Sequence, residues 1–339
     1  MRPTSATMEM GMSIQWFPGH MAKTRRLMAD NLKLVDVVVE LLDARLPQSS
    51  RNPLINEMIG DKPRALMMAK ADLAEEEHSK AWAAFFRKQG LAAVACNLKS
   101  ANPKAEIKAM TDAMRGQAKG VLARRESRGI GSKVVRVMIT GIPNVGKSTM
   151  INLLAGRAIA ETADRPGVTR GKQWIRLAQD LELLDMPGIL WPNLEDRDGA
   201  RKLAATGAIG DNAYNHQELA LWLIGWLRRH RPGRLQARYG VSEDIGEDDI
   251  AKLLSAHQGE DLAAGGGDGG ADSGAANGEP GQTDLASLVV LDAIGRRRGL
   301  LRKGGIVEVD KAAVILLDEL RGGKLGRITW DEPPADAAE

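Results

Sequence analysis

The chain has 339 residues, of which 43% are hydrophobic and 27% are charged, and its formal net charge is +3 at pH 7. These values are ordinary for a soluble globular protein, and the length predicts two domains. A single cysteine, Cys96, excludes an internal disulfide, and no apolar run approaches the ~18 residues of a membrane-spanning helix. The first residues lack the apolar core of a signal peptide, so we expect a cytoplasmic protein.

Strands and helices are predicted to alternate along the first half of the chain. After a flexible tail over 1–12, this alternation predicts an α/β domain over 13–200 with a mostly parallel sheet and helices on both faces. The predicted strands cover 34–42, 64–68, 92–96, 134–139 and 181–184. The predicted helices cover 22–34, 75–90, 103–122 and 150–154.

For the second half of the chain, the sequence predicts a small, mainly helical domain over 201–332 and a tail over 333–339. Its predicted helices cover 217–229, 247–257, 285–294 and 311–320. Residues 263–283 are rich in glycine and poor in apolar groups, which is typical of a flexible insertion.

A phosphate-binding loop is predicted between the strand over 134–139 and the helix that follows it. Residues 141–149 fit the pattern GxxxxGK[ST] without mismatch, and strand, glycine loop and helix are the context that this motif needs. Backbone N–H groups would cradle the phosphates. Lys147 would reach the terminal phosphates, and Ser148 would ligate Mg²⁺. A glycine turn that matches by chance is the alternative. The predicted contacts are Pro143, Asn144, Val145, Gly146, Lys147, Ser148 and Thr149.

A guanine-reading segment is predicted upstream of the phosphate loop. The stretch Ala69, Lys70, Ala71 and Asp72 resembles the NKxD motif of GTPases and follows a predicted strand. Asp72 can accept bonds from the guanine N1–H and exocyclic amine, and Lys70 can lie over the base. The asparagine amide is missing at Ala69, so we expect weaker or less selective guanine binding.

A second loop is predicted beside the base. Asn97 and Leu98 follow the strand over 92–96 and are expected to contribute to it. Asn97 is a candidate to compensate in part for the amide that Ala69 lacks, which the sequence alone does not show.

Two switch motifs follow the phosphate loop. Residues 164–169 resemble switch one, with Thr169 as a Mg²⁺ ligand and sensor of the γ-phosphate. Residues 185–188 form a DxxG motif, in which Asp185 is a predicted metal ligand and Gly188 a γ-phosphate contact. Because the base-reading segment precedes the phosphate loop, the motif order is rotated relative to that of other GTPases. We therefore predict a circularly permuted P-loop GTPase domain.

Several further motifs make the chain similar to the YlqF/RbgA family, bacterial GTPases that help mature the large ribosomal subunit. The resemblance implies a permuted GTPase domain followed by a small helical domain, and this helical domain is expected to contact RNA or the ribosome. The motifs are WFPGHM at 16–21, DARLP at 43–47, RNPL at 51–54, DMPGILWP at 185–192 and TGAI at 206–209.

The resemblance also implies how hydrolysis is assisted. Ile189 and Leu190 follow the DxxG motif, where other GTPases place a glutamine that orients water. The resemblance implies that the histidine of the WFPGH motif, which is His20, takes this role instead. Anchoring of the N-terminal segment, or contact with ribosomal RNA, is an equal alternative for His20. Asn144 matches an asparagine that holds K⁺ in related enzymes, and a loop-bracing amide is its alternative.

Basic clusters favour a partner with a phosphate backbone, although a solvated helix face is the alternative for each one alone. We predict a GTPase that binds the precursor of the large ribosomal subunit and its RNA, promotes late assembly, and hydrolyses GTP to GDP. We expect no contact with membranes or DNA. The alternatives are a nucleotide-regulated RNA-binding factor with a degenerate site, and a generic P-loop ATPase or kinase. The clusters contain Lys23, Arg25 and Arg26; Lys119, Arg124, Arg125, Arg128 and Lys133; and Arg296, Arg297, Arg298, Arg302 and Lys303.

Overall fold

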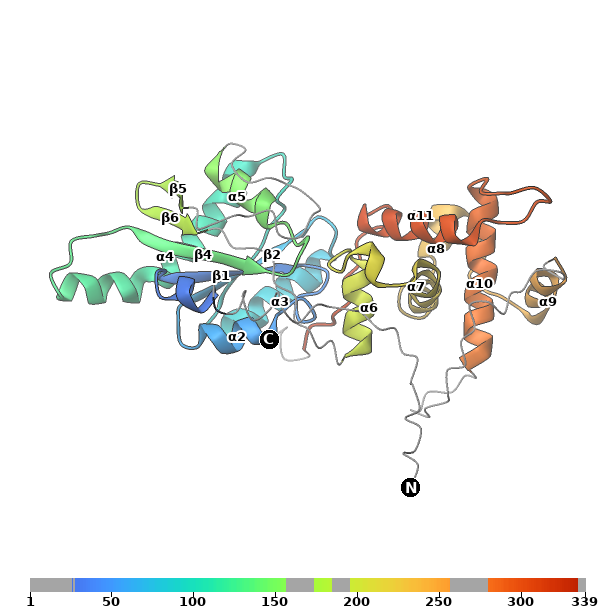
Figure 1. The fold of residues 1–339 in the computed structure, drawn as a ribbon, viewed down its shortest axis with the longest axis horizontal. Helices are drawn as coiled ribbons and strands as arrows, with labels where there is room; N and C mark the ends of the chain where they lie inside the picture. Colours follow the sequence, from blue (N-terminus) through green and yellow to red (C-terminus); the bar gives the residue numbers. More distant parts are fainter. Residues whose placement is uncertain (1–25, 27, 157–173, 185–195, 257–279, 335–339) are drawn as a thin grey trace, which may run out of the picture. The chain divides into compact units, whose positions relative to one another are not determined.

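The chain forms two compact units in a computed structural model that describes residues 26, 28–156, 174–184, 196–256 and 280–334 (Figure 1). The first unit contains a sheet and its helices within Trp16–Leu203, together with Gly207–Ile209 and Arg327–Glu339. The second unit is helical and contains Ala204–Thr206 and Gly210–Gly326.

The first unit is built on a six-stranded sheet in the order β3-β2-β1-β4-β6-β5. Neighbouring strands are parallel, except for β5 and β6, which pair antiparallel at one edge. The prediction of a mostly parallel sheet is thereby confirmed. The strands are β1 (Val37–Asp43), β2 (Arg64–Ala69), β3 (Ala92–Ala95), β4 (Val135–Gly141), β5 (Trp174–Ala178) and β6 (Leu181–Leu184).

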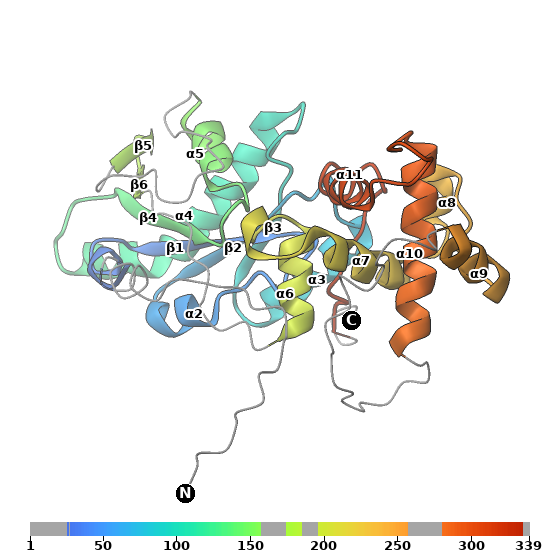
Figure 2. The same cartoon turned by 45° about the vertical axis from the view of Figure 1, so that its right-hand side comes forward.

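Helices cover both faces of this sheet, so its central strands are apolar runs without alternation. Figures 1 and 2 show α2 (Pro53–Ile59) and α3 (Glu76–Lys88) on one side of the sheet and α5 (Lys147–Ala155) on the other. The helix α4 (Pro103–Ser127) packs along β1 to β4 and beside α5. Every residue of β1 and β2 is buried. On the α3 side, Trp82 and Phe86 pack in one cluster with strand residues such as Leu66.

α3 is slightly shorter than its predicted range of 75–90, whereas α4 and α5 are longer than predicted. α4 continues to Ser127, beyond the predicted end at 122, with Met110, Met114 and Ala118 buried at four-residue spacing. α5 begins at Lys147, inside the phosphate loop, because Gly146 has a φ of 112° and serves as its N-cap.

The second unit consists of helices, as predicted for the C-terminal part of the chain. α10 and α11 both pack against α7, whose N-cap Asn215 accepts bonds from the backbone of Gln217 and Glu218. α10 begins inside the stretch predicted as a flexible insertion, and residues 263–279 within that stretch belong to the segment that the structure does not describe. The helices are α7 (His216–His230), α8 (Arg234–Tyr239), α9 (Glu247–Ala256), α10 (Pro280–Arg297) and α11 (Val309–Arg321).

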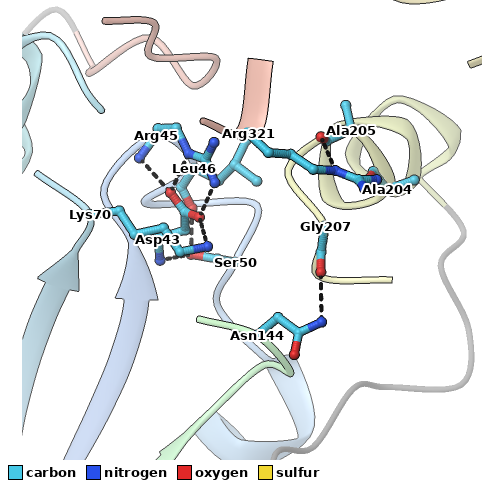
Figure 3. A network of polar contacts seen from close by, with 10 residues as sticks. All are labelled: Asp43, Arg45, Leu46, Ser50, Lys70, Asn144, Ala204, Ala205, Gly207 and Arg321. Atoms are coloured by element: carbon cyan, nitrogen blue, oxygen red, sulfur yellow. Dashed lines mark hydrogen bonds and ion pairs between the residues drawn. The ribbon is translucent and has the colours of Figure 1, made fainter. Parts of the chain in front are cut away.

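A shared carboxylate ties three helices of this unit together. Glu319 on α11 accepts bonds from Arg238 on α8, at 2.7 Å from Nε, and from Arg298, which follows α10, at 2.8 Å from Nη2. The guanidinium of Arg321 donates to the backbone oxygens of Ala204 and Ala205 at the end of α6 (Arg197–Ala205), as Figure 3 shows. None of the helices in the described ranges is long and apolar enough to cross a membrane.

Candidate functional site

The carboxyl ends of β1, β2, β3 and β4 meet at one edge of the sheet, because these four strands are parallel neighbours. Open α/β sheets bind ligands at this edge. The loop after β4 is the predicted phosphate loop, and the loop after β2 is the predicted base-reading segment. The fold therefore brings two motifs that lie about 70 residues apart in the chain to one edge of the sheet.

The phosphate loop has a backbone that only certain residues adopt. Asn144 and Gly146 have left-handed φ values of 54° and 112°. A Cβ atom at Gly141 would clash with the carbonyl oxygen of Leu41 on the neighbouring strand, so glycine permits the close approach of β4 to β1. The Lys147 Nζ donates to the Ile142 carbonyl oxygen at 3.1 Å, which holds the ammonium over the loop. A phosphate oxygen in the loop would compete for that ammonium.

The base-reading segment forms a tight turn that is bonded to the end of β3. Lys70 has a left-handed φ of 59°, and the Leu73 N–H donates to the Lys70 carbonyl oxygen at 2.9 Å. The Ala71 N–H donates to the Cys96 carbonyl oxygen at 3.3 Å. Asp72 is half-buried within this turn, and no hydrogen bond to its carboxylate is present among the described residues. Its carboxylate is therefore available to a ligand at this edge.

The loop after β3 connects the base side of the edge to the phosphate side. The Leu98 side chain lies 3.1 Å from the position of a Cβ atom built on Gly146, so it packs directly against the phosphate loop. The Asn97 side-chain oxygen accepts from the Lys99 N–H at 2.9 Å. This bond places the amide oxygen of Asn97 in a local turn, and compensation for Ala69 by Asn97 stays a prediction.

A buried ion cluster lies beneath the base-reading segment, at the end of β1 (Figure 3). The Asp43 carboxylate is 2.7 Å from Arg45 Nη2 and 3.0 Å from Lys70 Nζ. The Asp43 N–H donates to the Ser50 hydroxyl, which in turn donates to the Leu46 carbonyl oxygen. Register explains the contact with Lys70, because Asp43 is paired with Ala69 across β1 and β2.

The cluster changes the proton affinity of its members. Burial by itself would raise the pKa of Asp43, but the charges of Arg45 and Lys70 and the Arg45 hydrogen bonds hold that pKa well below its ordinary value. Burial lowers the pKa of Lys70, and the Asp43 charge offsets only part of this effect. Nearby, Cys96 is buried, and this burial raises the pKa of its thiol to about 12, as expected of an unreactive core residue.

Asn144 is exposed at the tip of the phosphate loop, and its amide has a partner in the same unit. Its Nδ2 donates to the Gly207 carbonyl oxygen at 3.0 Å (Figure 3). Gly207 belongs to the TGAI stretch that carried part of the family resemblance. The bond fits the loop-bracing role that was the alternative for Asn144.

The remaining predicted site residues are distributed as follows. Ser148 and Thr149 are half-buried in the first turn of α5, next to Lys147. His20, Thr169, Asp185 and Gly188 lie outside the described residues.

Sequence reasoning missed the ion cluster of Asp43 with Lys70. The signal was present as an aspartate at the end of an apolar strand, two residues before an arginine.

The mostly parallel sheet, with the phosphate loop after β4 and the base-reading segment after β2, defines the chain as a P-loop GTPase. A family model described as "50S ribosome-binding GTPase" matches residues 136–237. The ribosome biogenesis GTPase A of Bacillus cereus is 42% identical over 322 residues, which cover 95% of each chain. That of Priestia megaterium is 41% identical and covers 95% of this chain and 98% of its own. The chain belongs to the ribosome biogenesis GTPase A family.

A solved structure agrees with this assignment. The GNP-bound YlqF from T. maritima superimposes with a TM-score of 0.56 at 25% identity and covers 92% of this chain and 99% of its own. These relatives and the family model confirm the resemblance to the YlqF/RbgA family. They also confirm the predicted P-loop GTPase fold and the predicted GTP hydrolase activity in ribosome assembly.

Proposed function

We propose that the protein hydrolyses GTP to GDP on a precursor of the large ribosomal subunit, in the cytoplasm, and so promotes late assembly. The observation that carries this proposal is the meeting of the base-reading turn and the phosphate loop at one sheet edge, where the segment after β3 contacts the turn through Cys96 and the phosphate loop through Leu98. Membership of the ribosome biogenesis GTPase A family supports the large-subunit precursor as the binding partner. The order of the strands along the chain, with the base-reading strand β2 before the phosphate-loop strand β4, supports a circular permutation.

In this proposal, Asp72 reads the guanine edge and Lys70 lies over the base, while Ala69 contributes no amide. Pro143 to Thr149 cradle the phosphates. Mg²⁺ fits the residues present, since the Ser148 hydroxyl sits beside Lys147 and hard oxygen donors suit this ion. No cluster of three acidic, histidine or cysteine residues that could hold a metal is found in the described ranges. Thr169 and Asp185, the other proposed Mg²⁺ ligands, lie outside those ranges. Thr169, Asp185 and Gly188 are the proposed switch contacts.

Asn144 offers a place for K⁺ near the phosphates. Its Nδ2 is committed to Gly207, so its Oδ1 is the atom that would face a cation. If this proposal is correct, the parent enzyme is faster in K⁺ than in Na⁺, and Asn144→Ala removes the difference. If Asn144 only braces the loop, Asn144→Ala slows hydrolysis equally in both salts.

Ribosomal RNA is the proposed contact for the basic clusters. Near the end of α4, the side chains of Lys119, Arg124, Arg128 and Lys133 are exposed, whereas Arg125 pairs with Asp36 at 2.6 Å. Exposed cations of this kind attract a phosphate backbone, and their binding weakens as salt increases. Neither DNA nor membrane binding is part of this proposal.

The decisive experiment measures GTP hydrolysis with and without purified large subunits. We expect the large subunit to increase the rate of GTP hydrolysis. An equal rate of hydrolysis in its presence and absence would contradict the proposal. His20→Ala serves as the second arm. If His20 orients water, GTP affinity stays near the parent value and stimulated turnover falls by ~10²–10⁴-fold. If His20 contacts RNA or anchors the N-terminal segment, the variant recovers full turnover once it is saturated with subunits.

A nucleotide-regulated RNA-binding factor with weak hydrolysis is the second candidate, and the substitution at Ala69 favours it. Competition among GTP, GDP and ATP distinguishes the two. A strong preference for guanine nucleotides together with subunit-stimulated turnover supports the enzyme. A preference for guanine nucleotides without subunit-stimulated turnover supports the RNA-binding factor.

A further inference from the structure

The C-terminal segment of residues 327–332, here called the clasp, lies against the base-reading turn although it follows the helical unit in the chain. The Ile328 N–H donates to the Leu73 carbonyl oxygen at 3.0 Å, and Leu73 comes directly after Asp72. The Trp330 N–H donates to the Arg45 carbonyl oxygen at 2.8 Å. The clasp therefore bonds both to the turn that carries Asp72 and to the loop that carries the ion cluster.

Thr329 forms a reciprocal pair with Glu75, the N-cap residue of α3. The Glu75 N–H donates to the Thr329 hydroxyl at 3.0 Å, and the Thr329 N–H donates to Glu75 Oε2 at 3.2 Å. Thr329 is 0% exposed, so water does not compete for these bonds. The loss of either bond leaves a polar group without its partner, which is costly in a buried place.

Asp331 fixes the other end of the clasp. Its carboxylate accepts from the backbone N–H groups of Gln48 and Ser49, at 3.0 and 2.7 Å, and from the Ser49 hydroxyl at 2.7 Å. Its backbone oxygen accepts from the indole of Trp82 on α3 at 3.0 Å. The clasp is thus held from α3 on one side and from the loop after β1 on the other.

These contacts surround the turn at which guanine would be read. From the β3 side the turn is held by the Cys96 carbonyl oxygen, and from the opposite end of the turn by the clasp at Leu73 and Glu75. Ala69 has no side-chain amide to brace the turn from within. We propose that the clasp sets the position of the Asp72 carboxylate and that Thr329 is a positioning residue for guanine selectivity. This inference rests on the proposed role of Asp72.

The test measures the affinity of the full-length protein for GDP and for IDP, whose base lacks the exocyclic amine that Asp72 would bind. Thr329→Val keeps the shape of the side chain and removes the hydroxyl. We expect the GDP-to-IDP affinity ratio to fall about threefold to tenfold, the range for one lost hydrogen bond. Thr329→Ser restores the hydroxyl and should restore the ratio.

A matched control is Thr111→Val on α4, because the Thr111 hydroxyl bonds only within its own helix, to Ile107 and Lys108. This variant should keep the parent ratio. Glu75→Ala is the second test variant, since it removes the other half of the reciprocal pair and should lower the ratio as well. It keeps the inference testable if Thr329→Val does not fold.

Asp72→Ala separates the two levels of the proposal. If the parent does not prefer GDP over IDP, or if Asp72→Ala keeps the parent ratio, the assignment of Asp72 is wrong. If Asp72→Ala lowers the ratio while Thr329→Val and Glu75→Ala leave it unchanged, the positioning role of the clasp is overturned. Equal losses of GDP and IDP affinity in the two clasp variants would also overturn it, because a structural role alone does not distinguish the bases.

Discussion

Lys70 Nζ lies 3.0 Å from Asp43 Oδ2, so the lysine of the predicted base-reading segment is paired with the aspartate at the end of the adjacent strand. The Asp43 side chain is 3% exposed, and its Oδ2 also lies 2.7 Å from Arg45 Nη2. The stem of Lys70 thereby has a fixed direction in the absence of a base. A lysine held in this way loses little further freedom when a base stacks on it.

Asp43→Asn should destabilise the protein by about 3–5 kcal/mol, because it leaves two cations without their buried counter-charge. Urea unfolding at pH 7 measures this difference. The folded pKa of Asp43 lies well below its ordinary value of about 3.9. Its stabilising contribution is therefore present above pH ~4 and is lost as the pH falls further, so parent and variant should converge in acid.

The control for this prediction is Asp112→Asn, whose carboxylate is half-exposed on α4 and pairs with Lys108. It should change stability little, because exposed ion pairs contribute little. A loss as large as that of Asp43→Asn would show that burial of the cluster is not the cause.

Lys147→Ala should abolish detectable GTP hydrolysis and weaken binding of the triphosphate. The Lys147 ammonium is held over the phosphate loop by the Ile142 carbonyl oxygen, which places it where the terminal phosphates would lie. Phosphate release under saturating GTP measures the first effect, and titration with a labelled nucleotide measures the second. Lys252→Ala, an exposed residue of α9, should behave like the parent. Unchanged turnover in Lys147→Ala would contradict the assignment of this loop.

Ala69→Asn should tighten binding of GTP and GDP about fivefold, the value of one hydrogen bond of ~1 kcal/mol, and leave ATP nearly unaffected. Ala69 is 0% exposed at the end of β2, and its carbonyl oxygen accepts from the Ala44 N–H at 2.7 Å. An asparagine at this strand end would restore the missing amide beside the phosphate loop. Equal competition by ATP in the parent protein would show that Asp72 does not select guanine.

Glu319→Gln should destabilise the helical unit by about 2 kcal/mol, since hydrogen bonds to a charged group are worth more than neutral ones. The hydrogen bonds from Arg238 and the charges of Arg298 and Arg238 outweigh burial and lower the pKa of Glu319 to about 2 from its ordinary 4.5. The contribution is therefore present above pH 4.5 and is lost as the pH falls toward 2. Hydrogen exchange of α8 and α11 amides at several pH values measures it.

The matched control is Glu308→Gln, whose partner Lys311 is exposed. This variant should leave the hydrogen exchange rates of the α8 amides close to those of the parent protein. Persistence of the difference between parent and Glu319→Gln at pH 2 would contradict the ionic origin of the effect.

Much of the fold could be predicted because its signals are local in the chain. β1 and β2 are mostly apolar runs that are buried throughout, and β4 is buried except at Arg136; such runs are recognisable without knowledge of their neighbours. The helix ends were less accurate, as α4 shows, because a charged helix that continues beyond the sheet has no apolar period to mark its end.

Within the site, the phosphate loop was determined by the sequence itself. Its pattern specifies glycine where the backbone must turn and a lysine at a set distance, so the positions of Gly146 and Lys147 in the loop follow from the pattern alone. The class of protein followed from the same property, since the motifs at 69–72 and 185–188 are also contiguous.

Only the tertiary structure determined the pairing of Asp43 with Lys70 and the return of the clasp to Glu75. The first depends on strand register, which aligns Asp43 with Ala69 across two strands. The second joins residues 254 positions apart, and each of its two bonds pairs a side chain with a backbone N–H. A backbone N–H is present in every residue except proline, so no pattern along the chain could have predicted which loop the segment 327–332 would hold.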